Sequence, residues 1–546
     1  MNQKSYAHGL SSYSLLCETI GENLLSTCRK FPDHAALISP GQNYRATYRE
    51  FLQQVTKVSK AFLAMHIQKG DRIGIWCPNR YEWVLVQYAA ARIGAILVNI
   101  NPAYRSSELA YALGQSGVRL LVSALSFKNS NYKSMIEEAR SLCENLQEVI
   151  FLDEDWKHFL DRAASISDAE LKEVESAVQF DDPVNIQYTS GTTGFPKGVT
   201  LSHYNLLNNG FFIGRRLQYT ENDIVCIPVP FYHCFGMVIG NLCCTSHGAC
   251  MVIPSESFEP LKVLEAVEKE ACTSLYGVPT MFIAELQHPE FGRFNLTSLR
   301  TGVMAGSPCP VEVMKQVQSL MHMTDVQICY GMTETSPVST QTSDVTPFEK
   351  QVGTVGTVQD HLEIKIIDPE TGALVNRNTP GEFCTRGYSV MLGYWNNEKA
   401  TAEAIDRARW MHTGDLATMD DEGYINIVGR IKDMILRGGE NIYPREIEEF
   451  LYTHEAIADV QVIGVPSRKY GEEVMAWVKL KSGFDVSEND LHDFCRSRIA
   501  HFKVPKFWKF VEGFPMTVTG KIRKVEMREM AIKEMGLEEV ARIKTS

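Results

Sequence analysis

The sequence of 546 residues has no C-x-x-C pair, no uninterrupted apolar run of about 20 residues and no excess of basic side chains. Without paired cysteines the common zinc and dithiol motifs are excluded, and the 14 cysteines are scattered, many of them within apolar stretches. A reduced cysteine in such a stretch behaves as a small hydrophobe, so we expect a reducing compartment. The net charge of −12 argues against a nucleic-acid groove, because phosphate backbones require clustered Lys and Arg.

Targeting signals are also missing. The N-terminus has neither a basic region followed by an apolar run nor an Arg-rich pattern, and Lys544-Thr545-Ser546 is not the peroxisomal S-K-L signal. The longest apolar region, Met237 to Ile253, contains polar interruptions and is too short to span a membrane, so it predicts a buried helix that runs into a strand. These features predict a cytoplasmic protein without a transmembrane segment.

The first half of the chain alternates helix-like and strand-like segments. Thr47-x-x-Glu50 is a capping box that opens an amphipathic helix, and it is followed by a buried strand over Arg72–Trp76, a helix over 83–92 and a strand over 95–98. The same alternation returns at 222–285 and 299–330. Repeated βα units predict parallel sheets covered by helices.

The pattern changes after about residue 353. Strand-like runs separated by turn clusters predict a mostly antiparallel subdomain, and a compact α+β unit follows from Pro444. A chain of this length needs more than one core. We therefore predict an α/β protein with a large N-terminal domain (1–430), built from two parallel-rich αβ sheets plus the antiparallel β subdomain, and a small mobile α+β domain (431–546).

The densest cluster of chemical groups lies between Tyr188 and Val199. Residues 189–198 contain four hydroxyl side chains, three glycines and one lysine. Glycine lets backbone N–H groups approach an anion, while the hydroxyls and the lysine add donors and charge, so the segment predicts a polyphosphate loop. It is not a Walker A loop, because Lys197 precedes Gly198 rather than Ser or Thr. A polar surface turn is the alternative.

Six further segments carry chemistry-bearing residues. They are Pro230–Gly236, Tyr330–Thr335, Gly381–Trp395, His412–Leu416, Gly429–Pro444 and Val518–Ile522. In order and spacing, these segments and the loop resemble the adenylate-forming superfamily of acyl-CoA synthetases, luciferases and peptide-synthetase adenylation domains. The sequences of Arg386–Trp395 and Gly438–Pro444 resemble those of fatty acyl-CoA synthetases, most of all the medium-chain enzymes of the acyl-CoA synthetase family member 2 type.

The resemblance implies a two-step reaction. A fatty acid attacks the α-phosphorus of ATP to give acyl-AMP and pyrophosphate, and CoA then takes the acyl group. The resemblance favours a medium-chain acid as the substrate. The implied cofactors and co-substrates are ATP, Mg²⁺ and CoA, so the expected partners are small molecules. Monomer and homodimer both stay open.

The resemblance also implies roles for individual residues. ATP or AMP would be bound by Thr189, Ser190, Gly191, Thr192, Thr193, Gly194, Lys197, Tyr330, Gly331, Met332, Asp415 and Arg430. Catalytic roles are implied for Lys521, His233, Thr333 and Glu334, and Glu334 would also be the metal ligand. Lys432 matches the hinge, Gly438 and Gly439 the CoA channel, and the acyl pocket would include Gly302, Ala305 and Gly306.

Several of these residues also have purely structural interpretations, and the whole chain has alternative functional interpretations. Without the resemblance, Tyr330 and His233 are typical of core packing, Asp415 of a turn cap and Arg430 of a surface ion pair. Two alternatives to the fatty acid–CoA ligase are transfer of the acyl group to the phosphopantetheine of a separate carrier protein, and activation of a non-fatty acid, for example an aromatic one. A phosphotransferase that makes ADP and a non-catalytic scaffold are the readings from other classes.

Overall fold

The computed structural model describes residues 3–189, 196–307, 309–438, 440–496, 498–516 and 522–541. The chain forms two compact units. The larger unit comprises 7–364 and 385–412, and the smaller unit comprises 1–6, 365–384 and 413–546. These compact units are not divided at residue 430. The predicted domain boundary at that residue stays a prediction.

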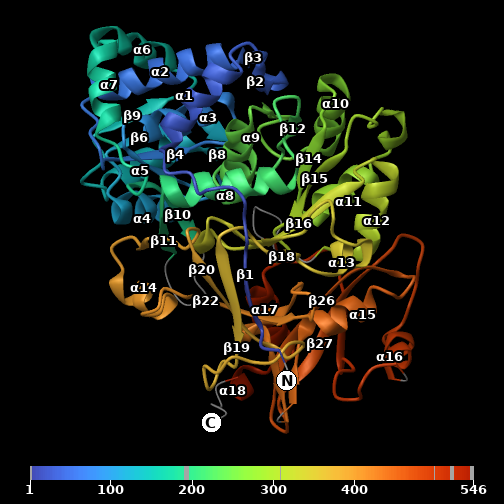
Figure 1. Cartoon of the computed structure of the whole chain (residues 1–546). Helices are drawn as coiled ribbons and strands as arrows, with labels where there is room; N and C mark the ends of the chain where they lie inside the picture. The colour runs from blue at the N-terminus through green and yellow to red at the C-terminus, as the bar shows by residue number, and fades with distance from the viewer. Residues whose placement is uncertain are drawn as a thin grey trace. The chain divides into compact units, whose positions relative to one another are not determined.

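The first sheet of the larger unit has seven strands and is parallel except at one edge. Its order is β21 (Gly393–Tyr394), β11 (Lys197–Ser202), β10 (Pro183–Thr189), β5 (Ile96–Asn99), β4 (Arg72–Trp76), β6 (Leu120–Ser123) and β9 (Glu148–Phe151). The two strands β11 and β21 are antiparallel to their neighbours. The parallel part confirms the βα pattern predicted for the N-terminal region (Figure 1).

The second sheet of the larger unit has nine strands and a parallel centre. Its order is β18 (Thr357–Val358), β17 (Val338–Gln341), β16 (Asp325–Gly331), β15 (Thr301–Ala305), β14 (Ser274–Gly277), β12 (Ile224–Cys226), β13 (Cys250–Val252), β2 (Ala35–Ser39) and β3 (Tyr44–Thr47). The early strand β2 pairs with β13, with Leu37 opposite Met251. Segments far apart in the sequence therefore complete this sheet. A short hairpin, β7 (Ser126–Phe127) and β8 (Ser130–Asn131), stands apart from both large sheets.

Helices cover these sheets. They are α1 (Ile20–Lys30), α2 (Tyr48–Ala64), α3 (Tyr81–Arg92), α4 (Ser106–Ser116), α5 (Tyr132–Arg140), α6 (Trp156–Asp161), α7 (Asp168–Ser176), α8 (His203–Arg216), α10 (Pro260–Glu270), α11 (Pro279–Leu286), α12 (Val311–Leu320), α13 (Phe348–Gly353) and α14 (Glu398–Ala404). Helix α2 begins after Thr47, whose side chain accepts from the Glu50 N–H while the Glu50 carboxylate accepts from the Thr47 N–H, as the capping box predicts. Helix α8 packs against β11 of the first sheet and β17 of the second, and α12 packs against β16 (Figure 1).

The long apolar region of the larger unit folds as predicted, into a buried helix that runs into a strand. It contains the π-helix η3 (Phe235–Leu242), the short helix α9 (Cys243–His247) and then β13. Every residue of η3 is buried. Among the described residues of this unit, four short 3₁₀ helices also occur, namely η1 (Pro40–Gln42), η2 (Arg162–Ser165), η4 (Phe291–Arg293) and η5 (Thr333–Thr335).

A five-stranded sheet follows the order β1 (Tyr6–His8), β19 (Leu362–Ile367), β20 (Gly381–Gly387), β22 (Met411–Met419) and β23 (Ile425–Arg430). Strands β22 and β23 are antiparallel, and Asp415 lies opposite Arg430. The division between the compact units falls along the chain within β1, β19, β20 and β22.

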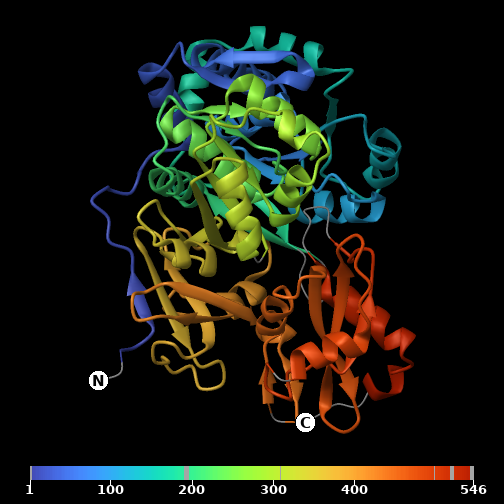
Figure 2. The same ribbon diagram turned by 90° about the vertical axis from the view of Figure 1, so that its right-hand side faces the viewer.

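The C-terminal part of the smaller unit is an α+β structure, as predicted. Its sheet has the order β25 (Glu440–Ile442), β24 (Ile435–Arg437), β27 (Gly471–Leu480) and β26 (Ile457–Ser467), with β28 (Phe507–Phe510) also paired to β27. The long hairpin of β26 and β27 is visible in Figure 2. The remaining elements are η6 (Ile431–Asp433), α15 (Pro444–Leu451), α16 (Glu488–Arg496), α17 (Lys524–Glu534) and α18 (Glu538–Ala541).

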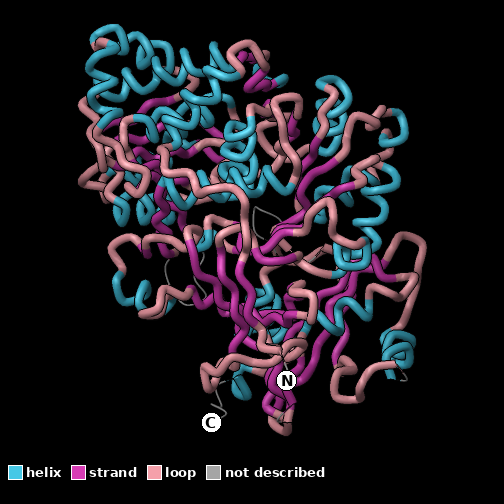
Figure 3. The backbone as a smooth tube through the Cα atoms, viewed as in Figure 1, coloured by secondary structure: helices cyan, strands magenta, loops and turns pink. Residues whose placement is uncertain are grey.

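This small sheet is apolar on both faces because alternate residues of its strands enter two separate cores. Val460 and Val462 of β26 pack with residues of α15 and α16, whereas Ile463 and Val465 pack with Met527 of α17. Figure 3 shows the strands in magenta among the cyan helices. No helix in the described ranges combines the length and the apolar character that a membrane crossing requires.

Candidate active site

The predicted polyphosphate loop joins two adjacent antiparallel strands. Thr189, the last residue of β10, lies opposite Lys197, the first residue of β11. Thr189 thus ends a strand whose other neighbour, β5, is parallel, and the carboxyl ends of parallel strands are where ligands bind in open α/β sheets. The predicted ligands between them, Ser190, Gly191, Thr192, Thr193 and Gly194, lie outside the described residues.

Helix α4 holds both ends of this loop. The Tyr111 hydroxyl donates to the Pro196 carbonyl oxygen at 3.0 Å, at the point where the loop enters β11. At the other end, the Tyr188 hydroxyl lies 2.5 Å from Gln115 Oε1 and 3.1 Å from the Ala112 carbonyl oxygen. The residues that flank the loop, Tyr188 and Pro196, are therefore tied to a helix that sequence reasoning did not connect with them.

The Glu334 carboxylate lies beside the start of the loop. Glu334 is in the single 3₁₀ turn η5 after β16, and its side chain is buried. Its Oε1 accepts hydrogen bonds from the Thr189 hydroxyl at 3.3 Å and from the Tyr394 hydroxyl at 2.9 Å. The structure thus brings together three residues from β10, η5 and β21 that are far apart in the sequence.

Lys197 completes this group through Tyr394. Its Nζ lies 4.9 Å from the centroid of the Tyr394 ring, within the range of a cation–π contact. The ring therefore contacts the cation on its face and the Glu334 carboxylate through its hydroxyl. Burial of the phenol, with the nearby Glu334 charge, raises the pKa of Tyr394, so Tyr394 stays a hydrogen-bond donor.

Burial also raises the pKa of the Glu334 carboxyl. Hydrogen bonds from its own backbone N–H, from Tyr394 and from Thr189, together with the charge of Lys197, offset this rise only in part. A buried carboxylate with a hydroxyl oxygen beside it is a set of hard oxygen donors, which suits Mg²⁺. A bound cation would favour the ionised form of this carboxyl.

The segment before Glu334 turns sharply at the end of β16. Tyr330 is half-buried, Gly331 is exposed, and Thr333 is buried next to Glu334. A Cβ at Gly331 would lie 1.8 Å from the Pro337 carbonyl oxygen, so no other residue fits this backbone. Met332, between them, is joined to Thr335 through its backbone N–H and C=O. Gly331 is therefore explained by a close approach of backbone to backbone.

His233 lies in the turn just before η3. Its Nδ1 accepts the Phe235 N–H at 3.1 Å, and its carbonyl oxygen accepts the N–H groups of Gly236 and Met237 at 3.0 Å each. The first bond uses the lone pair on Nδ1, so the proton of the neutral ring is on Nε2. The turn thus presets His233 as a hydrogen-bond donor through Nε2.

The three residues predicted for the acyl pocket lie within β15 (Gly302 and Ala305) and directly after it (Gly306). The Cβ position of Gly302 is occupied, with the Leu275 carbonyl oxygen at 2.0 Å and Met323 Cε at 2.3 Å. Gly306 has a φ of +91°, which favours glycine, and Ala305 is buried. Packing alone accounts for Gly302, and the pocket assignment stays a prediction.

A second group of predicted residues lies in the smaller unit. Arg430 Nε is 3.1 Å from Asp415 Oδ1 across the β22–β23 pair. The backbone N–H of Asp415 donates to the Thr413 hydroxyl at 3.1 Å, and that hydroxyl donates to the Phe383 carbonyl oxygen at 2.7 Å. The carboxylate is mostly buried while the guanidinium is half-exposed, so Arg430 is the more accessible member of the pair.

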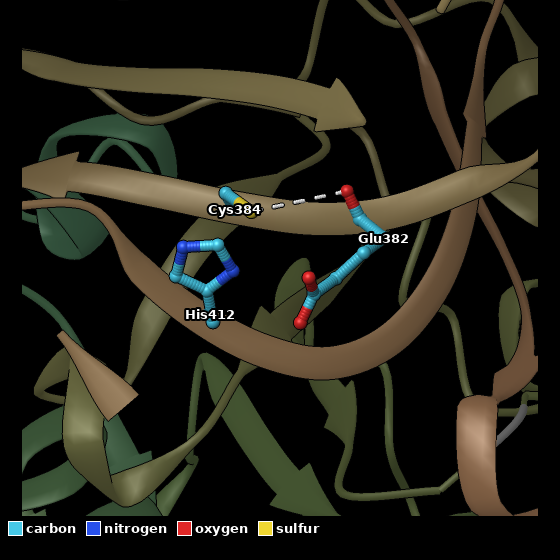
Figure 4. Close-up of side chains that lie close together, drawn as sticks. All are labelled: Glu382, Cys384 and His412. Carbon is cyan, nitrogen blue, oxygen red and sulfur yellow. Dashed lines mark hydrogen bonds between the residues drawn. The ribbon is translucent and has the colours of Figure 1, made fainter. Parts of the chain in front are cut away.

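Glu382 supports the turn before Asp415. Its Oε1 accepts the N–H of Gly414, which has a φ of +70°, at 3.2 Å. Figure 4 shows Glu382 with Cys384 and His412, and the potential ligand atoms of the three lie within 4.8 Å of one another. Because the Glu382 carboxylate already holds Gly414, we interpret this cluster as a support for the turn.

The remaining predicted residues follow β23 in the sequence. Lys432 lies exposed in η6, directly after β23. Gly438 has a φ of +61° and donates its N–H to the Tyr470 carbonyl oxygen at 2.8 Å. Gly439 and Lys521 lie outside the described residues.

Sequence reasoning missed the roles of Tyr394 and Glu382. Both stand in the segment 381–395, which was singled out only for its resemblance. For Glu382 a weak signal exists, since Thr413-Gly414-Asp415 needs a partner for its turn. For Tyr394 there is none, because its contact with Glu334 bridges 60 positions of the chain.

Comparison with known proteins identifies the family of the chain. A model of the AMP-binding enzyme family matches residues 24–395, and a model of the AMP-binding enzyme C-terminal domain matches 446–521. YngI of Bacillus subtilis (strain 168), named provisionally as an acyl-CoA synthetase, is 47% identical over 96% of this chain and 99% of its own. The medium-chain acyl-CoA ligase ACSF2 of Danio rerio, a mitochondrial protein, is 42% identical over 98% of this chain and 91% of its own.

The fold is shared more widely. The crystal structure of the anthranilate CoA ligase AuaEII in complex with anthranoyl-AMP covers 95% of this chain and 98% of its own, with a TM-score of 0.86 at 24% identity. At that identity the match bears on the fold alone. The two family models and the relatives above 40% identity decide the assignment. The chain belongs to the AMP-binding enzyme family.

Proposed function

We propose that this protein is an AMP-forming fatty acid–CoA ligase. The observation that carries the proposal is the buried Glu334 carboxylate, bonded to Thr189 at the start of the polyphosphate loop and to Tyr394, with Lys197 on the Tyr394 ring. Relatives named as acyl-CoA synthetases and ligases across nearly the whole chain support it.

In the first step a carboxylate oxygen of the acid attacks the α-phosphorus of ATP. The bond from that phosphorus to the bridging oxygen breaks, and pyrophosphate leaves with the bond's electron pair. Because two anions react, the protein contributes alignment and neutralisation of charge. Lys197 and the loop residues 189–194 would hold the departing phosphates, and Thr333 would contact the α-phosphate.

Glu334 and the Thr189 hydroxyl would hold Mg²⁺, which when bound neutralises phosphate charge. The Tyr394 hydrogen bond fixes the orientation of the Glu334 carboxylate that would hold the cation. His233, with its proton on Nε2, would donate to the acid's carboxylate and orient it for attack. Tyr330, with Gly331 and Met332, would pack against adenine.

The remaining roles are proposed for residues between 415 and 521. Asp415 would accept the ribose hydroxyls, and Arg430 would reach the ribose or the α-phosphate. Lys521 would act in adenylation only. A rotation at Lys432 would then bring Gly438 and Gly439 to the CoA channel, where the thiolate attacks the acyl carbonyl carbon and AMP leaves.

The acid is proposed to be medium-chain, because relatives at about 40% identity are named medium-chain acyl-CoA ligases. An apolar pocket distinguishes one methylene by only about 1–3 kcal/mol, so a broad optimum over neighbouring lengths is expected. The acyl pocket would lie near Gly302, Ala305 and Gly306.

The product pattern tests the proposal. The release of pyrophosphate and AMP and the consumption of CoA should be measured for straight-chain acids of about two to eighteen carbons and for aromatic acids. We expect equal amounts of pyrophosphate, AMP and acyl-CoA, with the highest kcat/KM for medium chains. Release of ADP would overturn the proposal. Turnover with a phosphopantetheinylated carrier protein but not with CoA would show that the acyl acceptor is the carrier protein rather than CoA.

Tyr394→Phe tests the contact that sequence reasoning missed. The phenylalanine keeps the ring under Lys197 but removes the hydrogen bond to Glu334. A hydrogen bond to a charged group contributes about 1.5–3 kcal/mol, so we expect kcat/KM for MgATP to fall about ten- to a hundredfold. Tyr132→Phe is the matched control, since it removes a hydrogen bond to the Pro102 carbonyl at a buried tyrosine on α5. Equal effects of the two substitutions would contradict the role of Tyr394.

A further inference from the structure

A closed ring of hydrogen bonds surrounds the backbone of His233, and all of them are buried except the part-buried bond to Tyr232. The Cys234 thiol donates to Gln187 Oε1 at 3.2 Å, and Gln187 Nε2 donates to Asn185 Oδ1 at 2.9 Å. Asn185 Nδ2 donates to Asn99 Oδ1 at 2.9 Å, and Asn99 Nδ2 donates to the Tyr232 carbonyl oxygen at 3.1 Å. The ring therefore leaves the chain directly after His233 and returns to it directly before His233.

Every amide in this ring has a defined orientation. Asn99, Asn185 and Gln187 each donate through nitrogen and accept through oxygen within the ring, so turning one amide over would place donor against donor. All three side chains are at most 3% exposed, so water cannot easily replace a lost partner. Such a satisfied network favours one arrangement of the segments that it joins.

The ring also connects the two parts of the site. Asn185 and Gln187 lie on β10, which ends two residues later at Thr189, and Asn99 is the last residue of the neighbouring strand β5. Thr189 contacts Glu334, whereas His233 lies in the turn that the ring encloses. One strand thus fixes both the residue at the phosphate loop and the segment that carries His233.

We propose that Asn99, Asn185 and Gln187, closed by the Cys234 thiol, are positioning residues that set His233 relative to Thr189. The ring would hold Nε2 of His233 where the acid's carboxylate must lie to meet the α-phosphorus. This inference rests on the proposed function, because it assigns His233 to the carboxylate. The ring residues touch neither substrate in this role and act only through His233.

The alternative is that the ring merely stabilises the sheet. A structural role would lower stability and would affect the two substrates alike. A positioning role affects the acid more than ATP, and its effect disappears once the imidazole is gone. The two roles therefore predict different kinetics, and not only different stabilities.

Asn185→Leu is the test, with Asn208→Leu as its matched control. Asn208 is also a fully buried amide of the larger unit, and it bonds both the N–H and the carbonyl of Leu16 but no residue of the site. We expect Asn185→Leu to lower the single-turnover rate of acyl-AMP formation and to raise KM for the acid, about ten- to a hundredfold in kcat/KM. KM for ATP should stay within about twofold, and Asn208→Leu should change neither constant.

A double mutant and a conservative variant complete the experiment. In a His233→Ala background, Asn185→Leu should add less than about twofold to the loss of rate. Cys234→Ser keeps the donor and should retain the rate, whereas Cys234→Ala should reproduce part of the Asn185→Leu effect.

The outcomes separate the two proposals. If His233→Ala slows adenylation but Asn185→Leu behaves like Asn208→Leu, the positioning role of the ring is overturned and the proposed function stands. Full additivity with His233→Ala overturns the ring in the same way. If His233→Ala itself leaves adenylation unchanged, the assigned role of His233 fails, and the ring proposal fails with it.

Discussion

Glu334→Gln is expected to slow acyl-adenylate formation by about two to three orders of magnitude, because it removes the negative charge at a buried cation site. Glutamine has nearly the shape of glutamate and can still accept from Tyr394 and Thr189, so the loss reports charge rather than packing. The measurement is the single-turnover yield of acyl-AMP and pyrophosphate as a function of Mg²⁺ concentration. We expect the variant to lose most of its response to Mg²⁺.

The pH profile gives an independent readout. Because burial raises the pKa of Glu334 and a bound cation favours the ionised carboxyl, protons compete with Mg²⁺ at this site, so at sub-saturating Mg²⁺ the adenylation rate of the unaltered protein should fall as the pH falls. The glutamine variant should lack this limb of the profile. Glu82→Gln is the control, because Glu82 is equally buried and accepts from Gln42 and Arg80 away from the site. A loss of adenylation as large for Glu82→Gln as for Glu334→Gln would count against the metal role.

Lys521→Ala is expected to separate the two half-reactions. Adenylation should fall about a hundred- to a thousandfold, since a positive charge on the reacting phosphate is lost. Conversion of preformed acyl-AMP and CoA to acyl-CoA should stay within about threefold, because the lysine would have left the site by then. The assay supplies acyl-AMP directly and follows thioester formation without ATP.

The control for this prediction is a lysine of the same domain at an exposed position. Lys481→Ala, just after β27, should leave both half-reactions unchanged. If Lys521→Ala slows both half-reactions equally, the exchange of two domain orientations is not supported. If it slows neither, the resemblance misassigns this residue.

Much of the fold follows from local sequence signals. The capping box at Thr47 marks the start of α2, and Pro444 marks the start of α15. Strand β4 has the bounds predicted from its apolar run, Arg72–Trp76. Helix α3, however, begins at Tyr81 rather than Trp83, because its N-cap, Arg80, makes no side-chain cap and so gives no signal. A buried helix was predicted in the region of η3, but its π character was not, since an entirely buried segment has no polar face from which a helical period can be read.

The site was predictable residue by residue but not as an arrangement. The glycines and hydroxyls of the loop predict a polyphosphate site, and the resemblance implies binding roles for Glu334, Asp415 and Arg430. The bond between Tyr394 and Glu334 depends on β21 joining the edge of the first sheet beside β11, which no local pattern encodes. The ring around His233 has the same origin, because register alone places Asn99 beside Asn185.

The pairing of β2 with β13 has a consequence for synthesis of the chain. The partner of Leu37 is Met251, about 200 residues later, so at roughly 5–20 residues per second a nascent β2 waits about 10–40 s for its partner. During that time the hairpin partner β3 covers one edge of β2, whereas the other edge, which carries the buried residues Leu37 and Ile38 and pairs with β13 in the finished protein, is open. A ribosome-bound chain stopped before β13 should therefore present a chaperone-binding segment near residue 37 that disappears once β13 has emerged.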